Sequence, residues 1–190
     1  MKKLIITIDG PAASGKGRIA KYIAKKYNFL HIDSGLLYRK IAKLLIDNKI
    51  DIKSITQIKQ FLVKNKNLSL RNNNNLRNEQ IGKVSSIIAK MSLVRDYVNK
   101  QQILYATQKT NKKGFVIDGR DIGSVVFKNA DLKLFIEVNP TVRAKRRHKQ
   151  LIDLGEKSIY PKLLKDIKLR DRKDKLRKNS PLIIPKGAYI

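Results

Sequence analysis

Hydrophobic and polar positions follow two patterns along the chain, short apolar runs and longer segments with helical spacing. The apolar runs cover residues 4–8, 29–32, 114–117 and 132–138. They are rich in β-branched and aromatic residues and show little alternation, which is typical of strands buried on both faces of a parallel sheet. The final segment, 187–190, predicts the beginning of a fifth strand.

Between these runs, apolar residues recur every three or four positions, as on one face of a helix. Helices are predicted from residue 19, over 36–48, within 50–66, over 78–91 and 92–111, from Pro140, and over 162–173. The polar stretch 67–76 predicts either a small hairpin or a loop. Strands that alternate with helices indicate an α/β fold with a parallel sheet.

A glycine motif lies between the first strand and the first helix. Gly10, Gly15 and Lys16 have the spacing GxxxxGK, within the run Gly10, Pro11, Ala12, Ala13, Ser14, Gly15, Lys16, Gly17 and Arg18. The spacing alone is a weak signal, but the order strand, loop, helix is that of a phosphate-binding loop. In such a loop the backbone N–H groups and the helix dipole face phosphate, and the lysine reaches the β and γ phosphates.

Charged residues follow the later strands. Asp118 comes at the carboxyl end of a strand, the edge where α/β sheets bind ligands, and there it can orient the waters of a magnesium ion. Arg143 with Arg147, and Arg170 with Arg177, are spaced to form two helical stripes that clamp phosphate charge. The alternatives are a turn aspartate and solvated surface arginines.

Composition changes this picture little. The 190 residues favour one domain, and the absence of cysteine excludes disulfides and thiolate metal sites. The net charge of +28 suggests a polyanionic partner, but aromatic residues do not interleave the basic ones as RNA-binding faces require. We therefore expect only weak, non-specific binding of polyanions and no specific nucleic-acid partner. We also expect no membrane partner and a cytoplasmic location.

The chain resembles bacterial cytidylate kinases along almost all its length. The matching segments are IDGPAASGKG (8–17), DSGLLYR (33–39), LRNEQI (76–81), SSIIAKMSLVR (85–95), DGRDIGSVVF (118–127), VRAKRR (142–147) and IKLRDRKDKLR followed by SPL (167–182). DGRDIGSVVF and the RDxxDxxR pattern are the most specific. The resemblance implies one P-loop kinase domain over 1–190, a three-layer α/β/α core with a parallel five-stranded sheet, a monophosphate-binding lobe at 36–98 and a lid at 148–165.

The resemblance also implies a reaction and its residues. A monomer would transfer phosphate from ATP, with Mg2+, to CMP or dCMP. The implied catalytic residues are Lys16, Asp118 (holding the metal through water), Arg120, Arg143, Arg147, Arg170 and Arg177. Contacts to the CMP phosphate are implied for Ser34, Arg39, Arg120 and Arg177, to cytosine for Ser86, Arg95 and Asp121, and to ribose for Arg170 and Asp174.

The sequence departs from the family pattern in three places. Gly17 stands where phosphate-binding loops usually have a hydroxyl residue, and Arg18 stands where this family usually has one. The insert at 67–75 looks shorter than the family's. The family's last helix is expected to be missing beyond residue 190. Two other readings stay open: another small-molecule P-loop kinase acting on UMP or dephospho-coenzyme A, and a basic P-loop protein that binds RNA.

Overall fold

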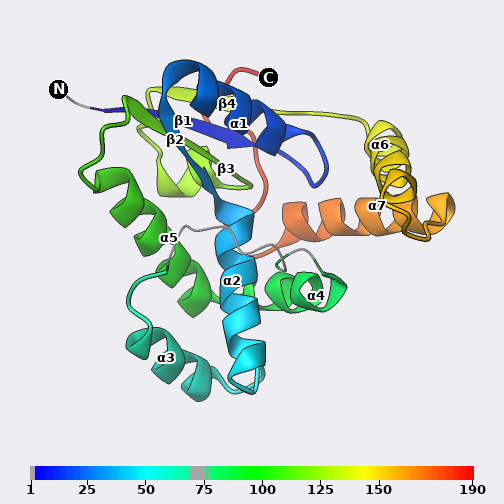
Figure 1. Ribbon diagram of the computed structural model, residues 1–190, viewed down its shortest axis with the longest axis horizontal. Helices are drawn as coiled ribbons and strands as arrows, with labels where there is room; N and C mark the ends of the chain where they lie inside the picture. The colour runs from blue at the N-terminus through cyan, green and yellow to red at the C-terminus, as the bar shows by residue number, and fades with distance from the viewer. Residues whose placement is uncertain (1–2, 69–75, 77) are drawn as a thin grey trace. The chain divides into compact units, whose positions relative to one another are not determined.

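The computed structural model describes residues 3–68, 76 and 78–190 and divides the chain into two compact units (Figure 1). The first unit combines Met1–His31 with Lys112–Ile190, and the second is Ile32–Asn111. Most of the stretch 67–76, for which the sequence predicts a hairpin or a loop, lies outside the described residues.

A parallel sheet forms the centre of the first unit. Its strand order is β2 (Phe29–Asp33), β3 (Gly114–Gly119), β1 (Leu4–Asp9), β4 (Leu132–Phe135). β1 pairs with β3 along its whole length, from Leu4 opposite Gly114 to Asp9 opposite Gly119. β3 is buried throughout, as expected for an apolar run at the centre of a parallel sheet. The carboxyl ends of β1 and β3 therefore lie at one edge.

The prediction of five strands is wrong for the described residues, which form four. The C-terminal segment contributes only an isolated parallel bridge between Tyr189 and Leu134. A turn closed by a 3.1 Å hydrogen bond from the Ala188 N–H to the Pro185 carbonyl occupies the preceding residues. Because that turn occupies the chain just before Tyr189, those residues do not align with β4.

Helices cover the sheet and extend beyond it. α1 (Lys16–Tyr27) packs its apolar face on the strands, where Ile8, Ala20, Phe29 and Val116 form a buried cluster. A short π-helix, η2 (Ile122–Val126), follows β3. α6 (Pro140–Asp153) begins with Pro140 in its first turn and packs against α7 (Tyr160–Leu176).

The second unit is helical. It contains α2 (Ser34–Asp47), α3 (Ile55–Lys64), α4 (Glu79–Ile88) and α5 (Ser92–Thr107). α2 packs against α4 and α5, and α3 packs against α5. Asp33, Ser54 and Asn78 cap the first turns of α2, α3 and α4 with side-chain oxygens, which explains where these helices start.

Candidate functional site

The glycine motif forms a tight loop between β1 and α1. Gly10 has φ 151°, and a Cβ on it would lie 2.4 Å from the backbone oxygen of Ile136, so no side chain fits there. Ala13 and Gly15 also adopt left-handed conformations, with φ 58° and 92°. These turns bring the chain directly into α1, whose cap residue Gly15 accepts from the N–H groups of Arg18 and Ile19.

Lys16 folds back over this loop. Its ammonium donates to the Pro11 carbonyl at 3.0 Å, and the residue is only 8% exposed. The hydroxyl of Ser14 is buried in the same loop with no hydrogen-bond partner among the described residues. A buried polar atom without a partner is unfavourable, and a ligand oxygen or hydroxyl at the loop would supply one.

Asp118, in β3, lies beside the glycine loop. A Cβ on Gly17 would lie 3.6 Å from Asp118 Oδ2, and the other oxygen, Oδ1, lies 2.6 Å from His31 Nε2. His31 therefore holds one carboxylate oxygen while the second faces the loop. His31 was not predicted from the sequence, although a single polar residue within the apolar run 29–32 was a signal for it.

Asp9, at the end of β1, is a second buried carboxylate that sequence analysis missed. It accepts from the N–H groups of Ile122 at 2.9 Å and Gly123 at 2.7 Å, and so holds the start of η2. The pKa of Asp9 is raised from 3.8 to about 6, mainly by burial; the negative charge of Asp121 also raises it, while the two backbone hydrogen bonds and the charge of Lys16 lower it.

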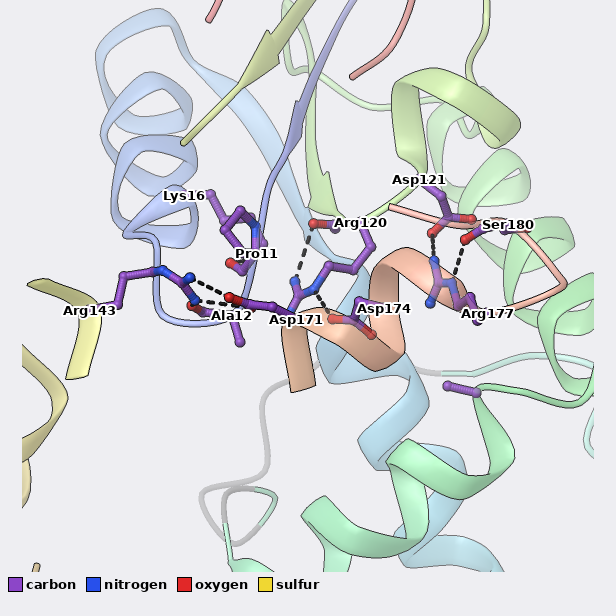
Figure 2. Close-up of polar contacts among 12 residues, drawn as sticks. Pro11, Ala12, Lys16, Arg120, Asp121, Arg143, Asp171, Asp174, Arg177 and Ser180 are labelled. Atoms are coloured by element: carbon purple, nitrogen blue, oxygen red, sulfur yellow. Dashed lines mark hydrogen bonds and ion pairs between the residues drawn. The ribbon is translucent and has the colours of Figure 1, made fainter. Parts of the chain in front are cut away.

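Three arginines of the first unit pair with three aspartates (Figure 2). Arg120 Nε donates to Asp174 Oδ2 at 2.9 Å. Arg177 Nη2 donates to Asp121 Oδ1 at 3.3 Å, and its Nε donates to the Ser180 carbonyl. Arg177 follows the last residue of α7 with an extended backbone, so it does not continue a helical stripe from Arg170.

The third pair joins α6 to α7. Arg143 Nη1 donates to Asp171 Oδ1 at 3.0 Å and to the Ala12 carbonyl at 2.9 Å, and its Nη2 donates to Asp171 Oδ2. Its Nε donates to the Val138 carbonyl at 2.8 Å. Arg147, one turn later, donates to Gln150 and is half-buried. Arg170 is exposed on α7.

The second unit holds the remaining predicted residues. Ser34 is buried as the first residue of α2, and Arg39 Nη1 donates to the Leu76 carbonyl at 3.0 Å. Arg95 is buried, donates to the Ala89 carbonyl at 3.1 Å and lies 5.9 Å from the centre of the Tyr38 ring. Ser86 is exposed, and its hydroxyl donates to the Gly82 carbonyl.

The donor set fits a magnesium ion that arrives with a nucleotide. Among residues 3–68, 76 and 78–190, no group of three or more His, Cys, Asp and Glu side chains could hold a metal ion by itself. Magnesium usually keeps several waters and is bound by substrate phosphates with one or two carboxylates. Asp118, with Oδ2 facing the glycine loop, is such a carboxylate.

The family model that matches this chain and two related proteins are all described as cytidylate kinases. The family model described as cytidylate kinase matches residues 6–190. A cytidylate kinase from Rickettsia conorii (strain ATCC VR-613 / Malish 7) is 44% identical over 185 residues, which cover 97% of this chain and 82% of that protein. A cytidylate kinase from Rickettsia akari (strain Hartford) is 42% identical over 189 residues, covering 100% of this chain and 84% of that protein.

Proposed function

This chain belongs to the cytidylate kinase family, and we propose that it binds ATP at the glycine loop of residues 10–18. Its reaction is the transfer of a phosphoryl group from ATP to CMP, which gives ADP and CDP. The observation that carries the proposed ATP site is the loop itself, with left-handed turns at Ala13 and Gly15 and with Lys16 folded over it. The family match does not favour a kinase for UMP or dephospho-coenzyme A, or an RNA-binding protein.

The loop acts by position and charge. Its backbone N–H groups and the amino end of α1 attract the phosphates, and the Lys16 ammonium neutralises the negative charge on the β and γ oxygens. The transition state of phosphoryl transfer is loose, with charge spread over peripheral oxygens, so fixed donors stabilise it without covalent chemistry. No general base is required, because the acceptor is already a phosphate anion.

Asp118 is the residue that we assign to magnesium, through water. Magnesium bound to ATP would neutralise charge on the phosphate oxygens. Asp118 Oδ2 faces Gly17, and Gly17 has no hydroxyl to act as a direct ligand, which favours a metal held by phosphates and water. His31 keeps the carboxylate in this orientation through the 2.6 Å bond to Oδ1.

Acceptor recognition is assigned by unit. In Ile32–Asn111 we assign Ser34 and Arg39 to the CMP phosphate, and Ser86 and Arg95 to the cytosine ring. In the other unit the assigned residues are Arg120 and Arg177 for phosphate, Asp121 for the cytosine amine, and Arg170 and Asp174 for ribose. Arg120, Asp121, Asp174 and Arg177 already form two neighbouring ion pairs (Figure 2).

Asp121 is the residue that we expect to separate CMP from UMP. Its carboxylate can accept a hydrogen bond from the exocyclic amine of cytosine, whereas uracil would present a carbonyl oxygen to it. That mismatch sets two hydrogen-bond acceptors against each other and costs on the order of 1–3 kcal/mol. dCMP carries the same base, and we propose it as a second acceptor.

A coupled ADP-release assay with CMP, dCMP, UMP and AMP tests the proposal. We expect CMP-dependent ADP release by the unaltered chain, and a reduced preference for CMP over UMP in Asp121→Asn. The matched control is Asp131→Asn, because Asp131 is not part of the Arg177–Asp121 ion pair. ADP release that does not depend on CMP, or an unchanged preference in Asp121→Asn, contradicts the assignments.

We propose that the segment 36–98 binds the monophosphate and that the segment 148–165 forms a mobile lid. The lid segment covers the end of α6 and the beginning of α7, and the other segment lies within the second unit. None of the helices in the described part of the chain combines the length and apolarity needed to cross a bilayer.

A further inference from the structure

We propose that Arg143 is a positioning residue for the glycine loop, held in place by Asp171. In this role it fixes the Ala12 carbonyl and so shapes the loop, instead of contacting phosphate directly as the sequence suggests. The inference rests on the proposed ATP site. It assigns a role to Asp171, which lies next to the predicted Arg170 but carries no predicted function.

Most donors of the Arg143 guanidinium are already used. A guanidinium has five N–H groups. In Arg143 they make four hydrogen bonds, to the Val138 carbonyl, the Ala12 carbonyl and both oxygens of Asp171. The residue is 2% exposed. Few donors therefore remain for a phosphate, and a phosphate contact would require some of these bonds to break.

The glycine loop has an unfavourable backbone conformation directly after the carbonyl that Arg143 binds. Ala13 has φ 58°, which is unfavourable for a residue with a Cβ and persists only where its surroundings hold it. The peptide group between Ala12 and Ala13 is planar, so fixing the Ala12 carbonyl also fixes the direction of the Ala13 N–H. The 2.9 Å bond from Arg143 acts on this carbonyl, directly before the strained residue.

A second cation, Lys16, binds the loop in the same way. Lys16 binds the Pro11 carbonyl, and Arg143 binds the next carbonyl in the chain, that of Ala12. Two successive carbonyls of the loop are thus each bound by a cation. Figure 2 shows Arg143, Asp171 and Ala12 grouped at one side of the loop.

The arrangement also links the loop to the proposed lid. Arg143 lies near the start of α6 and Asp171 in the second half of α7, on either side of the segment 148–165. A rearrangement that separates Asp171 from Arg143 would leave a buried guanidinium without its carboxylate, which is unfavourable. The pair therefore couples the position of α7 to the shape of the glycine loop.

The test compares Arg143→Gln, Asp171→Asn and the double variant in steady-state kinetics and in titration with a fluorescent ATP analogue. If Arg143 positions the loop, each single variant raises the KM for ATP by about tenfold, the double variant adds little, and the KM for CMP changes little. Arg143→Lys should resemble Arg143→Gln, because an ammonium cannot hold Asp171 and Ala12 in the same fork geometry. Asp166→Asn, an exposed aspartate on α7, is the matched control.

A direct phosphate contact predicts another pattern. Arg143→Gln would then lower kcat, and Asp171→Asn would leave the KM for ATP unchanged or lower it, which overturns the inference. Thermal unfolding of each variant separates loss of the fold from loss of position, and Asp171→Glu replaces Asp171→Asn if that protein does not fold. An unaltered chain with no CMP-dependent turnover would instead contradict the proposed function.

Discussion

The Lys16 side chain shows how one residue joins sequence, loop shape and chemistry. Its ammonium is held at 3.0 Å from the Pro11 carbonyl, within the loop that we assign to the phosphates. An ammonium is a compact charge with three donors on a flexible stem, so it can follow a phosphate without moving the backbone. Lys16 therefore contributes charge, and the glycines contribute shape.

Replacing Lys16 by Met tests this division. Met keeps most of the apolar stem but removes the charge, so we expect kcat to fall by about 10²–10³-fold, the range for removal of one transition-state donor. The fold should remain, because the loop turns are made by backbone. Single-turnover kinetics and circular dichroism measure the two effects. Lys21→Met, on the exposed face of α1, is the control and should keep its activity.

Asp9 makes the free energy of unfolding depend on pH in a predictable direction. Its pKa is about 6 in the fold against 3.8 as the ordinary value, so between these values the folded state binds more protons than the unfolded state. The free energy of unfolding should therefore decrease as pH rises from about 4 to about 6, by at most about 3 kcal/mol from this group, and change little above that.

Urea unfolding from pH 4 to pH 7, on the unaltered chain and on Asp9→Asn, measures the effect. Asparagine does not titrate, so the difference in unfolding free energy between the two proteins should change in that window and be level at higher pH. A difference that stays constant from about pH 4 to about pH 6 would show that Asp9 does not titrate in this range.

At the scale of elements, η2 packs closely against β1. A Cβ on Gly123 would lie 2.7 Å from Thr7 Oγ1 and 3.3 Å from Asp9 Oδ2. The Thr7 hydroxyl is buried and has no partner within the described part of the chain. η2 therefore depends on a glycine that lets Asp9 and β1 approach closely.

Gly123→Ala should lower the free energy of unfolding by about 1–3 kcal/mol, the usual cost of overpacking. Thr7→Ala removes the nearest of the atoms that the new methyl group would meet, so combining the two changes should recover part of the loss. Thr7→Val keeps the bulk and removes only the hydroxyl, so it should not rescue Gly123→Ala. Equal stability of the two double variants would contradict this account.

The elements also show what the sequence can predict. β1, β3 and the glycine loop are local features, since an apolar run and fixed glycines determine them within a few residues. η2 was missed because IGSVV is rich in β-branched residues, and its shape is set by Asp9, 113 positions away. Residue type and spacing predict Arg143, Arg147, Arg170 and Arg177, and the family resemblance predicts Arg39, Arg95 and Arg120. Nothing in the sequence indicates which carboxylate or carbonyl each of them binds.

At the scale of the whole molecule, the dominant property is charge. The chain has 43 Lys and Arg residues and 15 Asp and Glu residues, so even complete pairing would leave a net charge of +28. Such an excess attracts any anion, including nucleotides, and repels itself in the compact state. Both effects are screened by salt, with a screening length of about 10 Å at 0.1 M.

We therefore expect the KM for ATP to rise several-fold when NaCl is raised from about 50 mM to about 300 mM, with a much smaller change in kcat. Retention on immobilised RNA should fall over the same range, because non-specific binding depends on released counterions. The melting temperature should rise, because salt weakens the repulsion among the basic side chains. A KM that is independent of salt, measured at constant Mg2+, would mean that the binding of ATP depends on short-range contacts at the loop alone, and that the excess charge serves no part in collecting the substrate.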